Sequence, residues 1–316
     1  MSKWFIIAGL LMVLGLVVFA GVMTSLNWDF SRLSTSKFIT NTYEISDAFT
    51  DISINTDTSD VIFLPSEDGI CKIVCYEEEN VLHDVSVEEG TLKIRAHDRR
   101  KWYMHIGINF SSPKITVYLP ENQYGALMVK GSTGDVSIGN HASFDSVEVT
   151  MSTGDVKCLA TVSGLMRIKA STGDISVENL SAAMVDLTVT TGKVTVSGVT
   201  CQETMRIKVS TGKANVTDTQ CKNLISTGST GTITLKNVIA AEKFSIERST
   251  GDVKFDSSDA AEIYVKVSTG DVRGSLRSDK VFFVDTSTGD VSVPKTVTGG
   301  KCEITTSTGD VRITIG

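Results

Sequence analysis

Side chains that carry out chemistry are scarce in this sequence. Its only histidines are His83, His97, His105 and His141, and their spacing does not match the ligands of a zinc site. No glycine-rich phosphate loop, nucleophile elbow or zinc-protease motif is present. The sequence therefore predicts a protein that is not an enzyme and that uses no cofactor.

A surplus of positive charge is also missing. The 30 lysines and arginines are outnumbered by 37 aspartates and glutamates, which gives a net charge of −7. Proteins that bind nucleic acid neutralise its phosphates with clustered Lys and Arg, whereas most basic residues here are scattered. We therefore expect no nucleic-acid partner.

What the chain has in quantity is a repeat. Ten times between Ser132 and Asp310 it reads Ser or Thr, then Thr-Gly, then a charged or polar residue and an apolar one, and every interval between these glycines is 19 or 20 residues. A fixed period of this length is typical of solenoids, in which each repeat buries its apolar face against its neighbours. The turn glycines are Gly134, Gly154, Gly173, Gly192, Gly212, Gly231, Gly251, Gly270, Gly289 and Gly309.

Apolar residues flank each glycine with a spacing of two. The second residue after the glycine is apolar in all ten repeats, as at Val136, Val156 and Ile175. This spacing is typical of strands with one buried face, so each coil is expected to have one strand before the glycine and one after it. The predicted fold is all-β, a single-domain parallel β-solenoid (β-helix) of 19–20 residues per coil, preceded by one N-terminal transmembrane helix.

The N-terminal residues 4–23 are uncharged and mostly apolar. About 20 such residues are enough to cross a bilayer as a helix. Lys3 before them predicts a cytoplasmic N-terminus, so the protein is expected in the cell membrane as a single-pass protein with an extracellular C-terminal domain. A cleaved signal peptide is the alternative, because Val18-Phe19-Ala20 has the small-residue pattern of a cleavage site.

These features divide the chain into five expected parts. They are a cytoplasmic tip at 1–3, the membrane anchor at 4–23, a juxtamembrane linker at 24–40, irregular N-terminal capping coils at 41–120 and the regular solenoid repeats at 121–316.

Six cysteines in an exported chain suggest disulfides. Cys201 and Cys221 each lie nine residues after their repeat glycine, so we expect them to stack in adjacent coils near disulfide distance. Two buried thiols are the alternative for this pair. Cys158 and Cys302 occupy inward positions of the repeat and are expected to fill the core.

A ladder of aspartates beside the turns is a candidate cation site. Stacked carboxylates repel one another, and a bound cation such as Ca²⁺ would relieve that repulsion. However, Lys193, Lys213 and Thr232 interrupt the ladder, and one carboxylate per coil falls short of the about 6–8 oxygen ligands that Ca²⁺ takes. A solvated turn is therefore the favoured interpretation, and no metal is expected. The ladder comprises Asp135, Asp155, Asp174, Asp252, Asp271, Asp290 and Asp310.

One segment combines basic and aromatic side chains and is a candidate partner-binding site. It could contact lipid head groups, wall polymers or a partner protein, and a solvated hairpin end is the alternative. Its residues are Arg99, Arg100, Lys101, Trp102 and Tyr103.

The chain resembles the putative adhesin family, a bacterial domain of unknown function built of β-strand repeats. The resemblance rests on the Ser-Thr-Gly-Asp-Val repeats, the segment Asp51-Ile-Ser-Ile-Asn-Thr and the segment Lys114-Ile-Thr-Val-Tyr-Leu-Pro, and it covers about residues 41–316. It implies a right-handed parallel β-solenoid on the bacterial surface. It brings no catalytic or binding residues with it.

The sequence as a whole favours a membrane-anchored cell-surface β-solenoid that acts as a non-enzymatic adhesion or interaction scaffold. The alternative is a sensory or regulatory ectodomain that binds a wall polymer or a membrane partner in the envelope stress response. Expected partners are the membrane itself and a cell-wall polymer, a glycan or a membrane protein. End-to-end self-association through the C-terminal coil is also expected, because the chain stops directly after the strand-like residues 311–315 without a polar cap.

Overall fold

The computed structural model describes residues 2–29, 37–98 and 112–316. It begins with the apolar helix α1 (Ser2–Ser25). The most apolar 18 residues within Trp4–Ser25 have a mean hydropathy of 2.8 and are not buried by other parts of the structure. The helix is therefore long and apolar enough to span a membrane, as expected for this segment.

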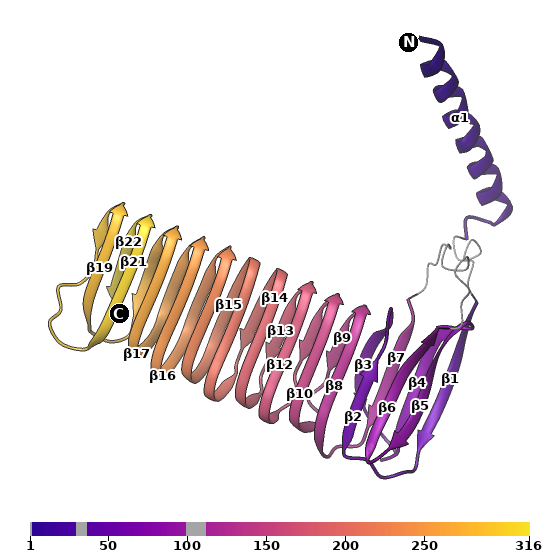
Figure 1. Ribbon diagram of the computed structural model, residues 1–316, viewed down its shortest axis with the longest axis horizontal. Coiled ribbons are helices and arrows are strands. Elements are labelled where there is room, and N and C mark those ends of the chain that lie inside the picture. Colours follow the sequence, from indigo (N-terminus) through magenta and orange to yellow (C-terminus); the bar gives the residue numbers. More distant parts are fainter. Residues whose placement is uncertain (1, 30–36, 99–111) are drawn as a thin grey trace.

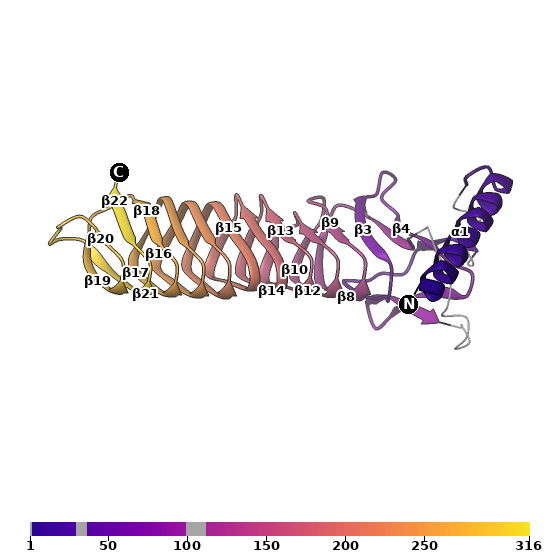
Figure 2. The ribbon, with the colours of Figure 1, turned by 90° about the horizontal axis from the view of Figure 1, so that it is seen from above.

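The rest of the described chain is a β-solenoid, as predicted, whose coils stack along one long axis (Figures 1 and 2). In each regular coil a long strand precedes the turn glycine and a short strand follows it. We call the two walls that these strands build the long-strand face and the short-strand face.

The long-strand face begins at the N-terminal end of the rod. In spatial order its first strands are β5 (Val81–Glu88), β6 (Thr91–Asp98), β2 (Asp51–Asn55), β8 (Gln123–Thr133), β10 (Ser143–Thr153) and β12 (Val162–Thr172). The short-strand face opposite begins with β1 (Phe38–Ile45), β4 (Cys71–Glu78), β7 (Lys114–Leu119), β3 (Asp60–Pro65), β9 (Val136–Ile138), β11 (Val156–Cys158) and β13 (Ile175–Glu178).

In the middle of the rod the strands continue through the corners between the faces. They are β14 (Ser181–Ser197), β15 (Thr200–Thr230), β16 (Ile233–Thr250) and β17 (Val253–Thr269). The far end is formed by β18 (Val272–Leu276), β19 (Lys280–Thr288), β20 (Val291–Ser292), β21 (Gly300–Thr308) and β22 (Val311–Ile315).

Equivalent residues of successive coils lie directly over one another. Val156 pairs with Val136 on one side and with Ile175 on the other, in parallel strands. All three side chains are buried, and with their equivalents they form one continuous apolar core from Ile52 to Ile313. Because the pleat period is two, any slip of one residue would turn this set outward, so the buried pattern fixes the register.

The turn glycines meet two steric requirements at once. Gly154 and Gly173 have φ values of 131° and 134°, in the left-handed half of the map where a Cβ is unfavourable. A Cβ on Gly154 would also overlap the carbonyl oxygen of Gly134, and one on Gly173 would overlap that of Gly154. The glycines therefore stack as a column, and the glycine carbonyl of the neighbouring coil leaves no room for a side chain at each of these two positions.

The N-terminal end differs from the regular repeats. There β4 runs antiparallel to β1 and β7, and β5 runs antiparallel to β6. The coil of β2 and β3 comes first in the chain, yet it lies between the coil of β6 and β7 and the coil of β8 and β9. The chain thus builds an inner coil, moves outward to form the cap, and returns to begin the regular repeats.

The C-terminal end also departs from sequence order. β17 pairs with β21 and β18 pairs with β22, while β19 and β20 pair with the other edges of β21 and β22. The last coil in the chain is therefore inserted between two earlier ones, and β19 lies at the outer end of the rod (Figure 1). The C-terminal coil is therefore not the free end of the rod that the prediction of self-association assumed, because β21 is paired on both edges and β22 also pairs with β20 at Val311 and Arg312; self-association itself stays a prediction.

Candidate functional site

The aspartate ladder holds the turns together through the backbone. The Oδ1 atom of Asp135 accepts a hydrogen bond from the backbone N–H of Asp155 at 2.8 Å, and that of Asp155 accepts one from Asp174 at 2.7 Å. Asp174 in turn accepts the N–H of Lys193 at 2.8 Å. One carboxylate oxygen per coil is thus used by the next turn, which supports the structural interpretation over a cation site.

A second run of the ladder follows the unusual coil order at the C-terminal end. Asp310 donates its backbone N–H to Oδ1 of Asp271 at 3.0 Å, and Asp290 donates to Oδ1 of Asp310 at 2.9 Å. Arg312 lies 2.7 Å from Oδ2 of Asp310, and Arg273 lies 3.1 Å from Oδ2 of Asp252. The carboxylates of Asp252, Asp271 and Asp310 therefore have partners within the protein.

All six cysteines are free and buried in the structure. Cys201 and Cys221, for which the sequence suggested a disulfide, lie in adjacent coils, since the N–H of Gln220 donates to the carbonyl of Val199. Burial raises the pKa of the Cys221 thiol to about 12. Cys158 and Cys302 are core residues, and burial raises the pKa of each to about 12.

The basic–aromatic cluster of residues 99–103 lies outside the described residues. The structure instead brings together a buried group that the sequence analysis missed, consisting of Cys75, Glu77 and His83. We call it the cap cluster.

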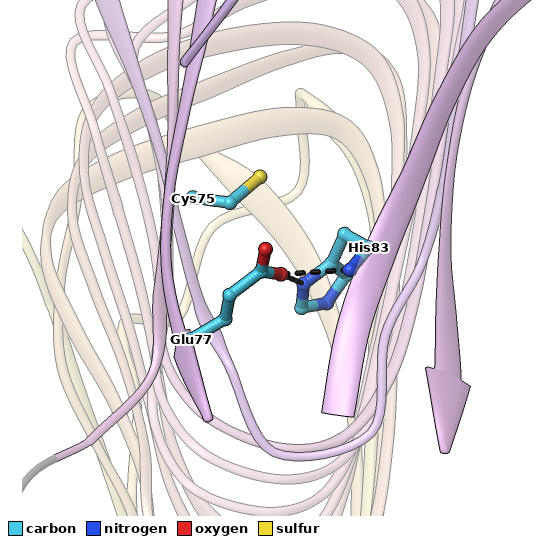
Figure 3. A group of neighbouring side chains, drawn as sticks. All are labelled: Cys75, Glu77 and His83. Atoms are coloured by element: carbon cyan, nitrogen blue, oxygen red, sulfur yellow. Dashed lines mark hydrogen bonds and ion pairs between the residues drawn. The ribbon is translucent and has the colours of Figure 1, made fainter. Parts of the chain in front are cut away.

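The cap cluster forms where the chain crosses from one face of the solenoid to the other. Cys75 and Glu77 are two residues apart on β4, so both point inward, and His83 points inward from β5 (Figure 3). Their side chains meet across the interior and are almost inaccessible, at 0%, 1% and 3% exposure. One potential ligand atom from each lies within 4.8 Å of the others.

Hydrogen bonds fix the carboxylate and the imidazole relative to each other. Oε2 of Glu77 accepts the backbone N–H of His83 at 2.7 Å and lies 2.6 Å from Nδ1 of the same residue. Oε1 accepts a hydrogen bond from Nδ2 of Asn41 at 2.7 Å, and Nε2 of His83 lies 3.1 Å from Oγ1 of Thr56. Since a carboxylate only accepts, Nδ1 carries the proton that it shares with Glu77.

The thiol of the cap cluster differs from the other two groups. Within the described chain, the thiol of Cys75 makes no hydrogen bond to another residue. Burial, followed by the charge of Glu77, raises the pKa of Cys75 to about 12. The nearby Tyr43, whose hydroxyl donates to the carbonyl of His83 at 3.2 Å, also has its pKa raised by burial and then by Glu77.

The cap cluster was hidden in the sequence for a physical reason. Its three side chains meet because β4 and β5 lie on opposite faces of the rod. No sequence motif marks such a meeting of two strands. The available signal was Glu77 itself, a charged residue that continues the inward alternation of Cys71, Ile73 and Cys75. Charged side chains are rarely fully buried without a partner, so such a position indicates a polar site.

Comparison with known proteins places the chain in a family. Similar solved structures include one from Parabacteroides distasonis ATCC 8503 described as a putative adhesin, at 13% identity, with 86% of this chain and 98% of that chain covered and a TM-score of 0.50. Another, from Parabacteroides merdae ATCC 43184, is also described as a putative adhesin, at 14% identity, with 77% and 96% covered and a TM-score of 0.50.

A further one from Parabacteroides distasonis ATCC 8503 is described as a putative lipid binding protein, at 18% identity, with 75% and 95% covered and a TM-score of 0.49. No curated protein matches the chain. The family model described as Toastrack DUF4097 matches residues 49–223 and 202–316, which together include most of the chain. The protein therefore belongs to the Toastrack DUF4097 family.

Proposed function

We propose that the protein is a non-enzymatic adhesion and interaction scaffold, anchored in the cell membrane by α1 and displaying its solenoid outside the cell. The length and hydropathy of α1 support the anchor. The stacked coils support a scaffold, because they present outward side chains at a regular spacing along a flat wall. The description of two similar structures as putative adhesins agrees with this role.

The observation that carries the proposal is a row of alternating lysine and threonine on the long-strand face. Lys130 pairs with Thr150, Thr150 with Lys169, Lys169 with Thr188, and Thr188 with Lys208. The three lysines are exposed. Because each coil advances by about 4.8 Å, the lysines repeat about every 10 Å.

These lysines are not neutralised by the protein itself. Among the ion pairs of the described residues, none includes Lys130, Lys169 or Lys208. In contrast, the neighbouring outward pair of Arg167 and Asp186 lies at 3.3 Å. The row is therefore a regular line of free positive charge on a protein whose net charge is −7.

The row leads into a hollow of about 390 Å³. Lys208, Lys266 and the acidic Glu247 line it together with several serines, and the absence of a side chain at Gly228 makes room for the guanidinium of Arg248. Beneath it, Arg248 is only 5% exposed, and its Nε has no hydrogen-bond partner. Burial lowers the pKa of Arg248 to about 10, so an anion in the hollow would stabilise the charged guanidinium.

A linear anionic polymer fits this surface, since its repeated negative charges can follow the lysine row along the rod. We therefore propose an anionic cell-wall polymer or an acidic surface glycan as the ligand class. The threonine and serine hydroxyls beside the lysines can hydrogen-bond to sugar hydroxyls.

Binding of the detergent-solubilised full chain to polygalacturonate, with neutral dextran as the comparison, tests this proposal. The triple variant Lys130→Gln, Lys169→Gln, Lys208→Gln is expected to bind polygalacturonate at least about 10-fold more weakly, because each exposed charge pair contributes up to about 1 kcal/mol. The matched control Lys157→Gln, Lys213→Gln, Lys236→Gln removes the same charge elsewhere and is expected to bind almost normally.

Equal losses in both triple variants, or equal binding to dextran, would contradict the proposal. A stoichiometric membrane protein recovered with the full chain from detergent extract, without polymer binding, would instead favour the sensory or regulatory ectodomain.

A further inference from the structure

The cap cluster combines three kinds of ligand that one class of metal ion prefers. A thiol, an imidazole and a carboxylate together suit Zn²⁺, whereas Ca²⁺ and Mg²⁺ prefer oxygen ligands alone. Tetrahedral zinc holds its ligand atoms about 3–4 Å apart, given bonds of about 2.0–2.3 Å. The ligand atoms of Cys75, Glu77 and His83 lie within 4.8 Å of one another, and Oε2 and Nδ1, which are 2.6 Å apart across their hydrogen bond, would separate to bind the ion.

We propose that Cys75, Glu77 and His83 form a zinc site that ties β4 to β5 at the N-terminal cap. Sγ of Cys75, Oε2 of Glu77 and Nδ1 of His83 would be the three protein ligands. β4 and β5 pair directly only through Glu78 and Val81, so the ion would link the two faces of the rod where few backbone bonds do.

The hydrogen bonds around the site suit this role. When Nδ1 binds the ion, the ring proton moves to Nε2, which then donates to Oγ1 of Thr56 at its present distance of 3.1 Å. Asn41 holds Oε1 of Glu77 and so leaves Oε2 directed at the imidazole. Outer partners of this kind orient metal ligands in known zinc sites.

Charge and protons also balance. The thiolate and the carboxylate supply two negative charges, the imidazole is neutral, and Zn²⁺ supplies two positive charges, so the loaded site is neutral in a buried environment. One proton leaves, from the thiol of Cys75 to water. Cys75 has no competing disulfide partner within reach on its own strand, because Cys71 is four residues away on an extended chain.

Three protein ligands with a water in the fourth position are an established zinc geometry, so a water would complete the coordination of the ion.

The test is titration of the chelator-treated full chain in detergent with Zn²⁺ and, separately, with Co²⁺ as a spectroscopic probe. We expect one equivalent of Zn²⁺ to bind and to raise the melting temperature, and Co²⁺ to give a thiolate-to-cobalt charge-transfer band. Cys75→Ser is expected to abolish the band and the stoichiometric binding. Thr56→Val, which removes only an outer partner, is expected to weaken Zn²⁺ binding about 10–100-fold.

Cys158→Ser is the matched control, because Cys158 is equally buried but lies in a regular coil away from the cap. It is expected to keep both the stoichiometric binding and the band. Failure of the wild-type chain to bind one equivalent, or unchanged binding in Cys75→Ser, would overturn the proposal. The readouts do not involve the lysine row, so the result is independent of polymer binding.

Discussion

At the scale of single residues, the turn glycine shows how tightly the stacked coils restrict the sequence. Its φ, between 128° and 150° in the ten turns, lies beyond the αL region that Asn and Asp tolerate and already favours glycine. In addition, the carbonyl of the stacked glycine occupies the space where a Cβ would lie, so no residue with a side chain fits. This second requirement arises from the neighbouring coil and therefore depends on the three-dimensional stacking.

Replacing Gly173 with alanine is expected to lower the free energy of unfolding by about 3 kcal/mol, through a strained φ and overlap with Gly154. Gly69→Ala is the matched control, because Gly69 has a φ of 74° but no atom within 4 Å of an added Cβ. It should cost only about 1 kcal/mol. Urea unfolding followed by circular dichroism measures both, and equal losses would contradict the stacking argument.

The aspartate ladder also makes a prediction at the residue scale. Asp155→Ala removes the acceptor for the N–H of Asp174 and is expected to cost about 1 kcal/mol, whereas Asp155→Asn keeps an oxygen acceptor and is expected to cost less. Thermal melts with and without Ca²⁺ compare the two variants with the wild type. A calcium-dependent rise in melting temperature that is lost in Asp155→Asn would instead indicate a cation site.

The number of free thiols, before and after unfolding, can be measured with a thiol reagent. Because burial raises the pKa of the thiols, to about 11 for Cys71 and about 12 for Cys158, thiolate is scarce in the folded protein at pH 8. We expect almost no reaction with Ellman's reagent in the native chain and six thiols after unfolding without reductant. Four thiols after unfolding would indicate the disulfide between Cys201 and Cys221 that the sequence suggested.

At the scale of elements, the sequence was sufficient to predict the strands but not their order at the ends. Alternating apolar residues around each glycine predicted the paired arms, and Val156 lies over Ile175 as expected. The same regularity hides the coil order, because Val265, Val284 and Ile304 occupy equivalent positions in three coils and any of them can pair with any other. Only the three-dimensional path of residues 293–299 brings the last coil back between its predecessors.

Engineered disulfides distinguish the two coil orders. Lys266 pairs with Thr305, and Thr305 pairs with Asp285, so Lys266 and Asp285 are two coils apart. The pair Lys266→Cys and Thr305→Cys is expected to cross-link under mild oxidation, and the pair Lys266→Cys and Asp285→Cys is not. Non-reducing electrophoresis after proteolysis reports the bond, and the opposite result would mean that the coils stack in sequence order.

The cap cluster was beyond prediction for a related reason. Its three residues come from β4 and β5, which lie on opposite faces and run antiparallel to their neighbours, unlike the strands of the repeats. The repeat pattern therefore gave no register for this part of the chain. A buried Glu77 was the one local sign that polar chemistry lies there.

At the scale of the whole molecule, the solenoid is a rod with a regularly repeated surface. The cap, with β1 and β4, follows α1 in the chain, while β19 lies at the far end of the rod (Figures 1 and 2). Long flat walls with short turns suit an extended ligand better than a small substrate, which needs a concave pocket. The proposed function depends on this rod lying outside the membrane.

Labelling of intact cells with a membrane-impermeant maleimide tests that dependence most directly. Val297 is 88% exposed near the far end, and the six native cysteines are buried, so Val297→Cys supplies a single accessible thiol. We expect this variant to be labelled in intact cells and the wild type to stay unlabelled. Labelling of Val297→Cys only after the cells are lysed would place the solenoid inside the cell and contradict the proposed function.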